Sequence, residues 1–187
     1  MLLTEIKKKL KAESSVEFAE QMKKVAPGAT KIYGIKMPVL NELAKACKQG
    51  GFDLVSALWQ SGAYEERILA AKTIRLLARQ DPDYAIALVK KFSVDIDNWA
   101  VCDTLGMQSL KTINKIRSKE IFLLATEFST SKFMWQRRLS LVLVEDFCKQ
   151  KEFHPAIIQL IVKQKSDKEY YIKRAVAWLE ASLNKHI

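Results

Sequence analysis

A tryptophan and a carboxylate lie close together near the middle of the chain, in the segment 97–103 (Asp-Asn-Trp-Ala-Val-Cys-Asp). Because Trp99 and Asp103 are four residues apart, a helix would place both on one face. A carboxylate can accept a proton or stabilise positive charge, and an indole face is electron-rich. The pair is therefore a candidate for chemistry at a cationic centre, and the rest of the chain must position it.

The chain around this pair is strongly basic. It has 187 residues, with 31 Lys and Arg against 21 Asp and Glu, so its formal net charge is +10. This balance favours a polyanionic partner, with nucleic acid foremost. The alternative interpretation is that the lysines solubilise exposed helix faces.

The cysteines and histidines argue against a metal site or a disulfide framework. Cys47, Cys102 and Cys148 are odd in number and widely spread, and His154 and His186 are equally scattered. No apolar run approaches the roughly 18 residues of a membrane span, and the N-terminus lacks the apolar core of a signal peptide. We therefore expect reduced thiols, no metal, no membrane contact and a cytoplasmic protein of the bacterial cytosol or nucleoid.

Apolar residues recur at helical spacing along the whole chain, and no stretch shows the alternation typical of a strand. A capping box at Ser14 and Glu17 predicts the start of the second helix, and Asp81 before Pro82 predicts the start of another. Asp97 or Asn98 is expected to cap the helix that carries the Trp–Asp pair. Helices are predicted over about 3–12, from just after Ser14 to about 25, and over about 38–48, 52–59, 64–79 and 82–92. The next predicted helix is the one that carries Trp99 and Asp103, and others follow over about 118–128, 134–149, 153–164 and 168–183, so the predicted fold class is all-α.

The longer helices repeat at a fixed period. Arg67, Asp103, Arg138 and Arg174 follow one another at intervals of 36, 35 and 36 residues, and each begins a similar apolar run. Two helices per period of about 36 residues are typical of an α-solenoid of HEAT-like or armadillo-like repeats. We expect residues 1–187 to form a single HEAT-like repeat domain of about five helix pairs, with the second helices lining a concave basic groove.

Equivalent positions in a solenoid form a column along the concave face. Here three cations surround one carboxylate, and two further cations stand beside them: the full set is Arg67, Asp103, Arg138, Arg174, Arg137 and Lys173. These groups would bind a polyanion and present the acid. The alternative is a network of salt bridges between adjacent repeats, because ion-pair networks also gather charges in this way.

Three tryptophans, Trp99, Trp135 and Trp178, each lie about one helical turn from this column. In that position they could stack on bases or sugars. The alternative is that they fill the seams between repeats, as large aromatic side chains often do. For Trp59, which lies on the apolar side of a first helix, we predict a core position.

Four segments resemble the AlkD-type DNA alkylation repair glycosylases, a family of HEAT-like solenoids. Residues 99–103 (Trp-Ala-Val-Cys-Asp) resemble its Trp-Asp-x-Val-Asp motif, and residues 135–138 (Trp-Gln-Arg-Arg) resemble its tryptophan followed by arginine. Residues 170–178 are similar to the segment that ends in its third tryptophan, and residues 33–38 to the turn before an early helix. The resemblance covers most of the chain, with the repeats in the same order.

The resemblance implies a hydrolase of N-glycosyl bonds that excises N3- and N7-alkylated purines from double-stranded DNA without a metal or organic cofactor. It makes Asp103 the catalytic carboxylate, with Trp99 and Trp178 beside the deoxyribose and Arg138 on a backbone phosphate. The remaining candidates for DNA contact are Trp135, Arg137, Lys173, Arg174 and Arg67. We expect a monomer. We also expect a shortened C-terminus, because Ile187 lies nine residues after Trp178 and better-known members of the family continue through another repeat.

Two other functions stay open from the sequence. A catalytically inactive DNA-binding solenoid that reads damaged or branched DNA would keep the basic groove but would need no acid. A protein-binding scaffold would need neither the acid nor the basic column. Salt-sensitive DNA binding without base release would favour the first, and absence of DNA binding would favour the second.

Overall fold

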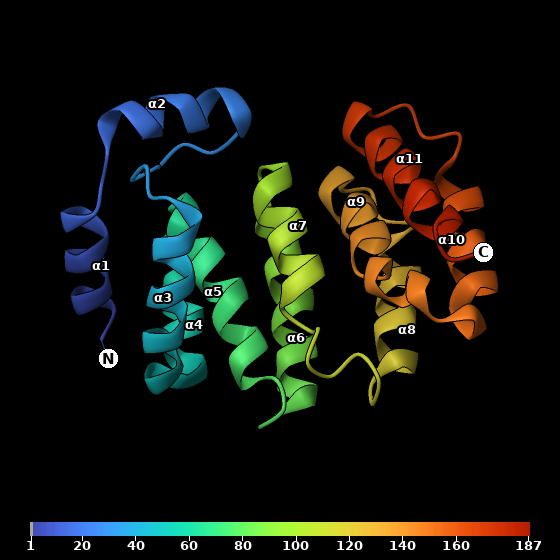
Figure 1. Cartoon of the computed structure of the whole chain (residues 1–187), viewed down its shortest axis with the longest axis horizontal. Helices are drawn as coiled ribbons and strands as arrows, with labels where there is room; N and C mark the ends of the chain where they lie inside the picture. Colours follow the sequence, from blue (N-terminus) through green and yellow to red (C-terminus); the bar gives the residue numbers. More distant parts are fainter. Residues whose placement is uncertain (1) are drawn as a thin grey trace.

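The computed structural model describes residues 2–187, which fold into a stack of helices with the two termini at opposite ends (Figure 1). No strand occurs in this part of the chain, so the all-α prediction is confirmed. The α-helices are α1 (Leu3–Ala12), α2 (Val16–Val25), α3 (Met37–Cys47), α4 (Gly51–Gln60), α5 (Tyr64–Leu77), α6 (Pro82–Phe92), α7 (Trp99–Gln108), α8 (Ser118–Phe128), α9 (Met134–Val142), α10 (His154–Gln164) and α11 (Tyr170–Asn184). Short 3₁₀ helices cover Lys48–Gly50, Ser93–Asp95, Glu145–Lys149 and Lys151–Phe153.

The helices pack as the repeat predicts. The second helices α5, α7, α9 and α11 each contact the next in line and form one wall, while α4, α6, α8 and α10 are the first helices of the successive pairs. One hydrophobic cluster runs through the whole stack, from Ile6 on α1 to Leu183 on α11. Each pair buries its apolar face against its neighbours, which is the packing of an α-solenoid. The predicted α-solenoid is therefore confirmed.

Side-chain caps fix where the two helices of the central repeat begin. Asp81 accepts a hydrogen bond from the backbone N–H of Tyr84 at the start of α6, with Pro82 at the first helical position. Asn98 accepts one from the backbone N–H of Val101 and so caps α7. Of the two residues proposed as the α7 cap, Asn98 is the correct one, and it sets the rotation of the helix that carries the Trp–Asp pair.

Several predicted boundaries differ from the structure. The N-cap of α2 is Ser15, whose hydroxyl accepts from the N–H of Phe18, whereas the Ser14 hydroxyl donates to the carbonyl of Lys11. The helix predicted over 134–149 ends at Val142 and continues, after two turn residues, as a 3₁₀ helix. Within this 3₁₀ helix, Asp146 accepts a hydrogen bond from the side-chain amide of Asn114, 3.2 Å away in the preceding repeat.

The start of α11 is also later than the predicted residue 168. The carboxylate of Asp167 accepts hydrogen bonds from the backbone N–H of Glu169 at 3.0 Å and from Nε of Arg137 at 2.7 Å. These contacts hold the segment before Tyr170 outside the helix, as local side-chain hydrogen bonds commonly do. None of the helices in residues 2–187 combines the length and the apolar character that a membrane crossing requires.

Candidate functional site

A cleft of about 340 Å³ opens where α7, α9 and α11 meet. It brings together Asp103 and four other residues predicted to form the site. Its lining is Trp99, Asp103, Arg138, Tyr170, Tyr171, Arg174 and Trp178. Acidic, cationic and aromatic groups from three consecutive repeats therefore meet in one hollow.

Asp103 and Arg138 form a two-pronged ion pair in this cleft. Nε and Nη2 of Arg138 donate to Oδ1 and Oδ2 of Asp103, each at 2.8 Å. Nη1 of Arg138 donates to the backbone carbonyl of Tyr171 at 2.5 Å. The fork geometry fixes the plane of the carboxylate, since a bidentate pair constrains both partners. Arg138 is only 7% exposed, whereas the side chain of Asp103 keeps 21% of its surface open.

The environment keeps Arg138 charged. Burial alone would lower the pKa of its guanidinium, but the hydrogen bond and charge of Asp103 outweigh burial and raise that pKa above its ordinary value. The thiol of Cys102, beneath the site, responds differently: burial and the neighbouring carboxylate raise its pKa, so it stays a neutral thiol. The charges at the base of the cleft are therefore those of the Asp103–Arg138 pair.

A glycine explains how α7 and α9 come close enough to form this pair. Gly106 lies three residues after Asp103, on the side of α7 that faces α9. A Cβ atom at this position would be 2.7 Å from Cγ1 of Val142 and 3.1 Å from Cδ1 of Leu139. Any side chain there would push the two helices apart, and the ion pair spans the same interface.

The indole of Trp99 is anchored by the N-terminal part of the chain. Its Nε1 donates to the carbonyl of Val25, 2.7 Å away at the end of α2. In Figure 1, α2 lies at the top of the view, and α7 begins on that same side. The turn after α2 approaches closely as well, since a Cβ on Gly28 would be 2.1 Å from the carbonyl oxygen of Asp97. The end of α2 and the turn after it therefore orient Trp99 over the cleft.

Tyr170 and Tyr171 also line the cleft, although the sequence did not predict them as site residues. The Tyr171 ring packs on Trp135 with centroids 5.0 Å apart, and its carbonyl accepts the hydrogen bond from Arg138. Tyr170 is exposed at the start of α11. The spacing could have found it, because Tyr170, Arg174 and Trp178 recur every four residues and so share one helix face.

Other predicted residues have structural partners outside the cleft. Nη1 of Arg67 pairs with Asp97 at 2.8 Å and its guanidinium lies over Trp59, and Nε of Arg137 pairs with Asp167 at 2.7 Å. For these two arginines the geometry matches the salt-bridge alternative. Neither they nor Trp135 nor Lys173 lines the cleft.

Two tryptophans pack in or against the hydrophobic core. Trp59 is fully buried and stacks on Phe92 with a centroid distance of 4.4 Å, so the core position predicted for it is correct. Trp135 is partly buried against the core, and its backbone carbonyl accepts a weak hydrogen bond from the Cys102 thiol. Trp99 and Trp178 remain as the two tryptophans that line the cleft together with Asp103.

The sequence model of the DNA alkylation repair enzyme family matches residues 6–186. The chain belongs to this family. Its structure is similar to that of a predicted DNA alkylation repair enzyme from Enterococcus faecalis, with a TM-score of 0.78, 17% sequence identity, and coverage of 93% of this chain and 84% of that one. At this identity the similarity establishes the shared fold. No curated protein matches the chain in sequence. Family membership suggests a role in DNA alkylation repair, with DNA as the substrate.

Proposed function

We propose that this family member is a DNA glycosylase that excises N3- and N7-alkylated purines from duplex DNA. One observation carries the proposal: the Asp103 carboxylate, held by Arg138, opens into a cleft that two indoles, Trp99 and Trp178, also line. A carboxylate of fixed orientation among aromatic faces suits the stabilisation of positive charge.

Excision of an alkylated purine requires mainly a group that stabilises positive charge on the sugar and directs a water molecule. An N3- or N7-alkylated purine carries a positive charge, so it can leave as a neutral base without a general acid. As the bond between the base nitrogen and C1′ breaks, positive charge develops on the deoxyribose. A water oxygen then bonds to C1′ and loses a proton. Asp103 would stabilise the developing charge and orient or deprotonate that water, because part of its carboxylate faces the cleft.

Arg138 acts in this proposal mainly by positioning Asp103. A guanidinium has five N–H groups, and three of those of Arg138 already donate to Asp103 and Tyr171. Only the remaining two could reach the phosphate that the family resemblance assigns to it. Arg174, which is exposed and lines the same cleft, is better placed to hold a phosphate, and exposed Lys173 adds to the positive field.

The test is a release assay on duplex DNA methylated at N7 of guanine and N3 of adenine. The wild-type protein should release free methylated purines, and Asp103→Asn should release about 10²–10³-fold less, by analogy with the loss of other preorganised charge-stabilising groups. Asp83→Asn is the matched control, because Asp83 also pairs with an arginine, Arg117, but lies on first helix α6 and is largely exposed. It should release bases at the wild-type rate.

The outcomes separate the competing functions. Base release that survives Asp103→Asn would refute the assignment of this residue. Duplex binding that weakens with salt, without base release by any variant, would identify a catalytically inactive DNA-binding solenoid instead.

A further inference from the structure

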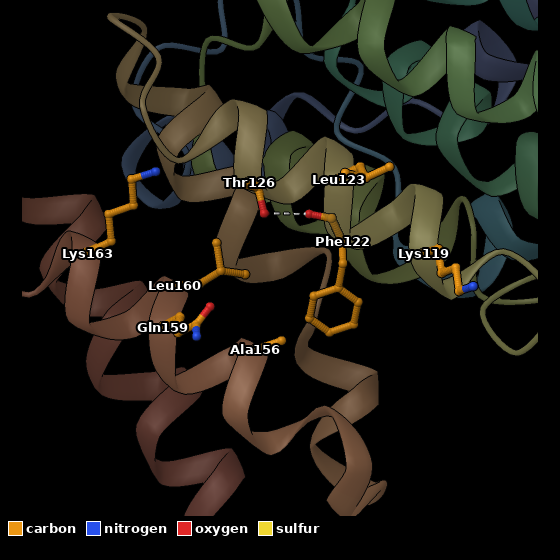
Figure 2. Close-up of a pocket in the computed structure, with 8 residues that line it drawn as sticks. All are labelled: Lys119, Phe122, Leu123, Thr126, Ala156, Gln159, Leu160 and Lys163. Carbon is orange, nitrogen blue, oxygen red and sulfur yellow. Dashed lines mark hydrogen bonds between the residues drawn. The ribbon is translucent and has the colours of Figure 1, made fainter.

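A second hollow lies between first helices α8 and α10, away from the candidate site on the second helices. It has a volume of about 460 Å³. Four residues from each helix line it: Lys119, Phe122, Leu123, Thr126, Ala156, Gln159, Leu160 and Lys163 (Figure 2). On both helices the spacing is i, i+3, i+4, i+7, so each helix contributes one stripe of side chains to the walls of what we call the α8–α10 groove.

The neighbouring seam between α6 and α8 is closed by charge pairs. Arg117 pairs with Asp83 at 3.1 Å, and Lys90 pairs with Glu127 at 2.7 Å. At the α8–α10 groove the corresponding acids are missing. Within residues 2–187, neither Lys119 nor Lys163 forms a salt bridge. The two lysines lie toward opposite ends of the groove in Figure 2.

The groove also exposes apolar side chains. Leu123 on α8, which lines the groove, is 70% exposed, and Val162 on α10, which does not line it, is 64% exposed. Phe122 forms part of the wall and is held in place by Phe147 and Phe153, with centroids 5.1 and 5.3 Å away. A fixed aromatic surface beside exposed aliphatic side chains is characteristic of a protein-binding groove.

We propose that the α8–α10 groove docks an amphipathic helix of a partner protein, with acidic residues near both of its ends. The apolar stripe would receive leucine-like side chains at i, i+3 or i+4, and i+7, and the acids would supply the missing partners of Lys119 and Lys163. Each stripe spans eight residues, so the groove is about 10 Å long and accommodates about two helical turns.

Charge and surface chemistry select this occupant. A nucleic acid would leave Leu123 and Phe122 exposed to a polar backbone. A second copy of this chain would bring another +10 of formal net charge against the two unpaired lysines. An acidic helix satisfies both the apolar and the cationic groups, and it would leave the cleft at Asp103 open, because that cleft is built from the second helices.

The experiment selects a random helical-peptide display library on the full-length protein, with counter-selection on Leu123→Asp. We expect enriched peptides that carry apolar residues at helical spacing and Asp or Glu near both ends. Synthetic versions should bind Leu123→Asp at least about tenfold more weakly, and the double variant Lys119→Glu/Lys163→Glu likewise. Lys91→Glu on α6, an exposed lysine outside the groove, is the matched control and should bind as the wild type does.

Folding failure would not obscure the result. Leu123 and the lysines do not belong to the buried core, and the far-ultraviolet circular dichroism and melting temperature of each variant should match the wild type. The proposal would be overturned if no peptides were enriched. It would also be overturned if the enriched peptides were not acidic, or if they bound wild type and Leu123→Asp equally.

Discussion

Replacing Arg138 by Met tests the ion pair on which the candidate site depends. The substitution keeps an unbranched side chain of comparable bulk but removes the cation. It leaves the carboxylate of Asp103 and the carbonyl of Tyr171 without their partner, since both now accept from the guanidinium. A carboxylate left unpaired in a partly buried position destabilises the folded state.

The expected size follows from burial. Breaking a fully buried pair typically costs about 3–5 kcal/mol. Because 21% of the Asp103 side chain is exposed, water can partly replace the lost partner, and we expect about 2–3 kcal/mol. For a chain of 187 residues each kcal/mol shifts Tm by about 2–4 °C, so Tm should fall by about 5–10 °C.

Urea unfolding followed by circular dichroism measures this cost, and a double-mutant cycle assigns it to the pair. Asp103→Asn/Arg138→Met has no unpaired carboxylate, so it should be at least as stable as Arg138→Met alone, with a coupling energy of about 1–2 kcal/mol. The reasoning would be refuted if Arg138→Met cost less than about 0.5 kcal/mol, or if the two single effects added without coupling.

Three further predictions concern the scaffold. Gly28→Ala should destabilise the protein by about 1–3 kcal/mol in urea unfolding and slow base release, because at φ 103° its Cβ would be 2.1 Å from a backbone carbonyl oxygen. The control is Gly51→Ala, with φ 62° but open space around it. It should cost about 1 kcal/mol in urea unfolding and leave the rate of base release unchanged. Burial raises the pKa of Asp167, but the hydrogen bond and charge of Arg137, together with backbone hydrogen bonds, outweigh burial and lower the net pKa. The resulting stabilisation is therefore complete above the unfolded pKa of about 3.9 and is lost as pH falls through the lower folded value. Asp167→Asn should cost about 1–2 kcal/mol in urea unfolding at pH 7, and the cost should shrink steadily as the pH is lowered below about 3.9. The three cysteine thiols should react slowly with a disulfide reagent at pH 8 until the chain is denatured, since all are buried and burial raises the pKa of Cys47 to about 11; fast reaction in the native state would contradict the buried positions.

Much of the fold follows from periodicity. The spacing of Asp103 and Arg138 by 35 residues, one repeat, placed them in register on adjacent second helices, and the structure joins them directly. The end of α9 at Val142 could not be predicted, because the apolar run continues without Gly or Pro. The 3₁₀ helix that follows is held by a hydrogen bond from Asn114 of the preceding repeat, and a local sequence pattern does not reveal such a contact.

The candidate site was predicted less completely. The types and positions of Trp99, Asp103 and Trp178 placed them correctly in one cleft. The sequence gives no sign that Arg137 pairs with Asp167, because such partners depend on side-chain directions in the folded stack. The Trp99 indole is anchored by the backbone carbonyl of Val25, 74 residues earlier in the chain. Every residue has such a carbonyl, so the amino-acid types could not predict this contact.

The most direct test of the account is a single-turnover measurement on a duplex that contains one N7-methylguanine, with wild type and Asp103→Asn in excess over DNA. The account predicts that the rate of base release falls by at least about 10² in the variant, while the Kd for the duplex changes by less than about threefold, since the carboxylate would act in the transition state rather than in binding. Equal release rates, or a loss explained entirely by weaker binding, would contradict the claim that Asp103 performs the chemistry.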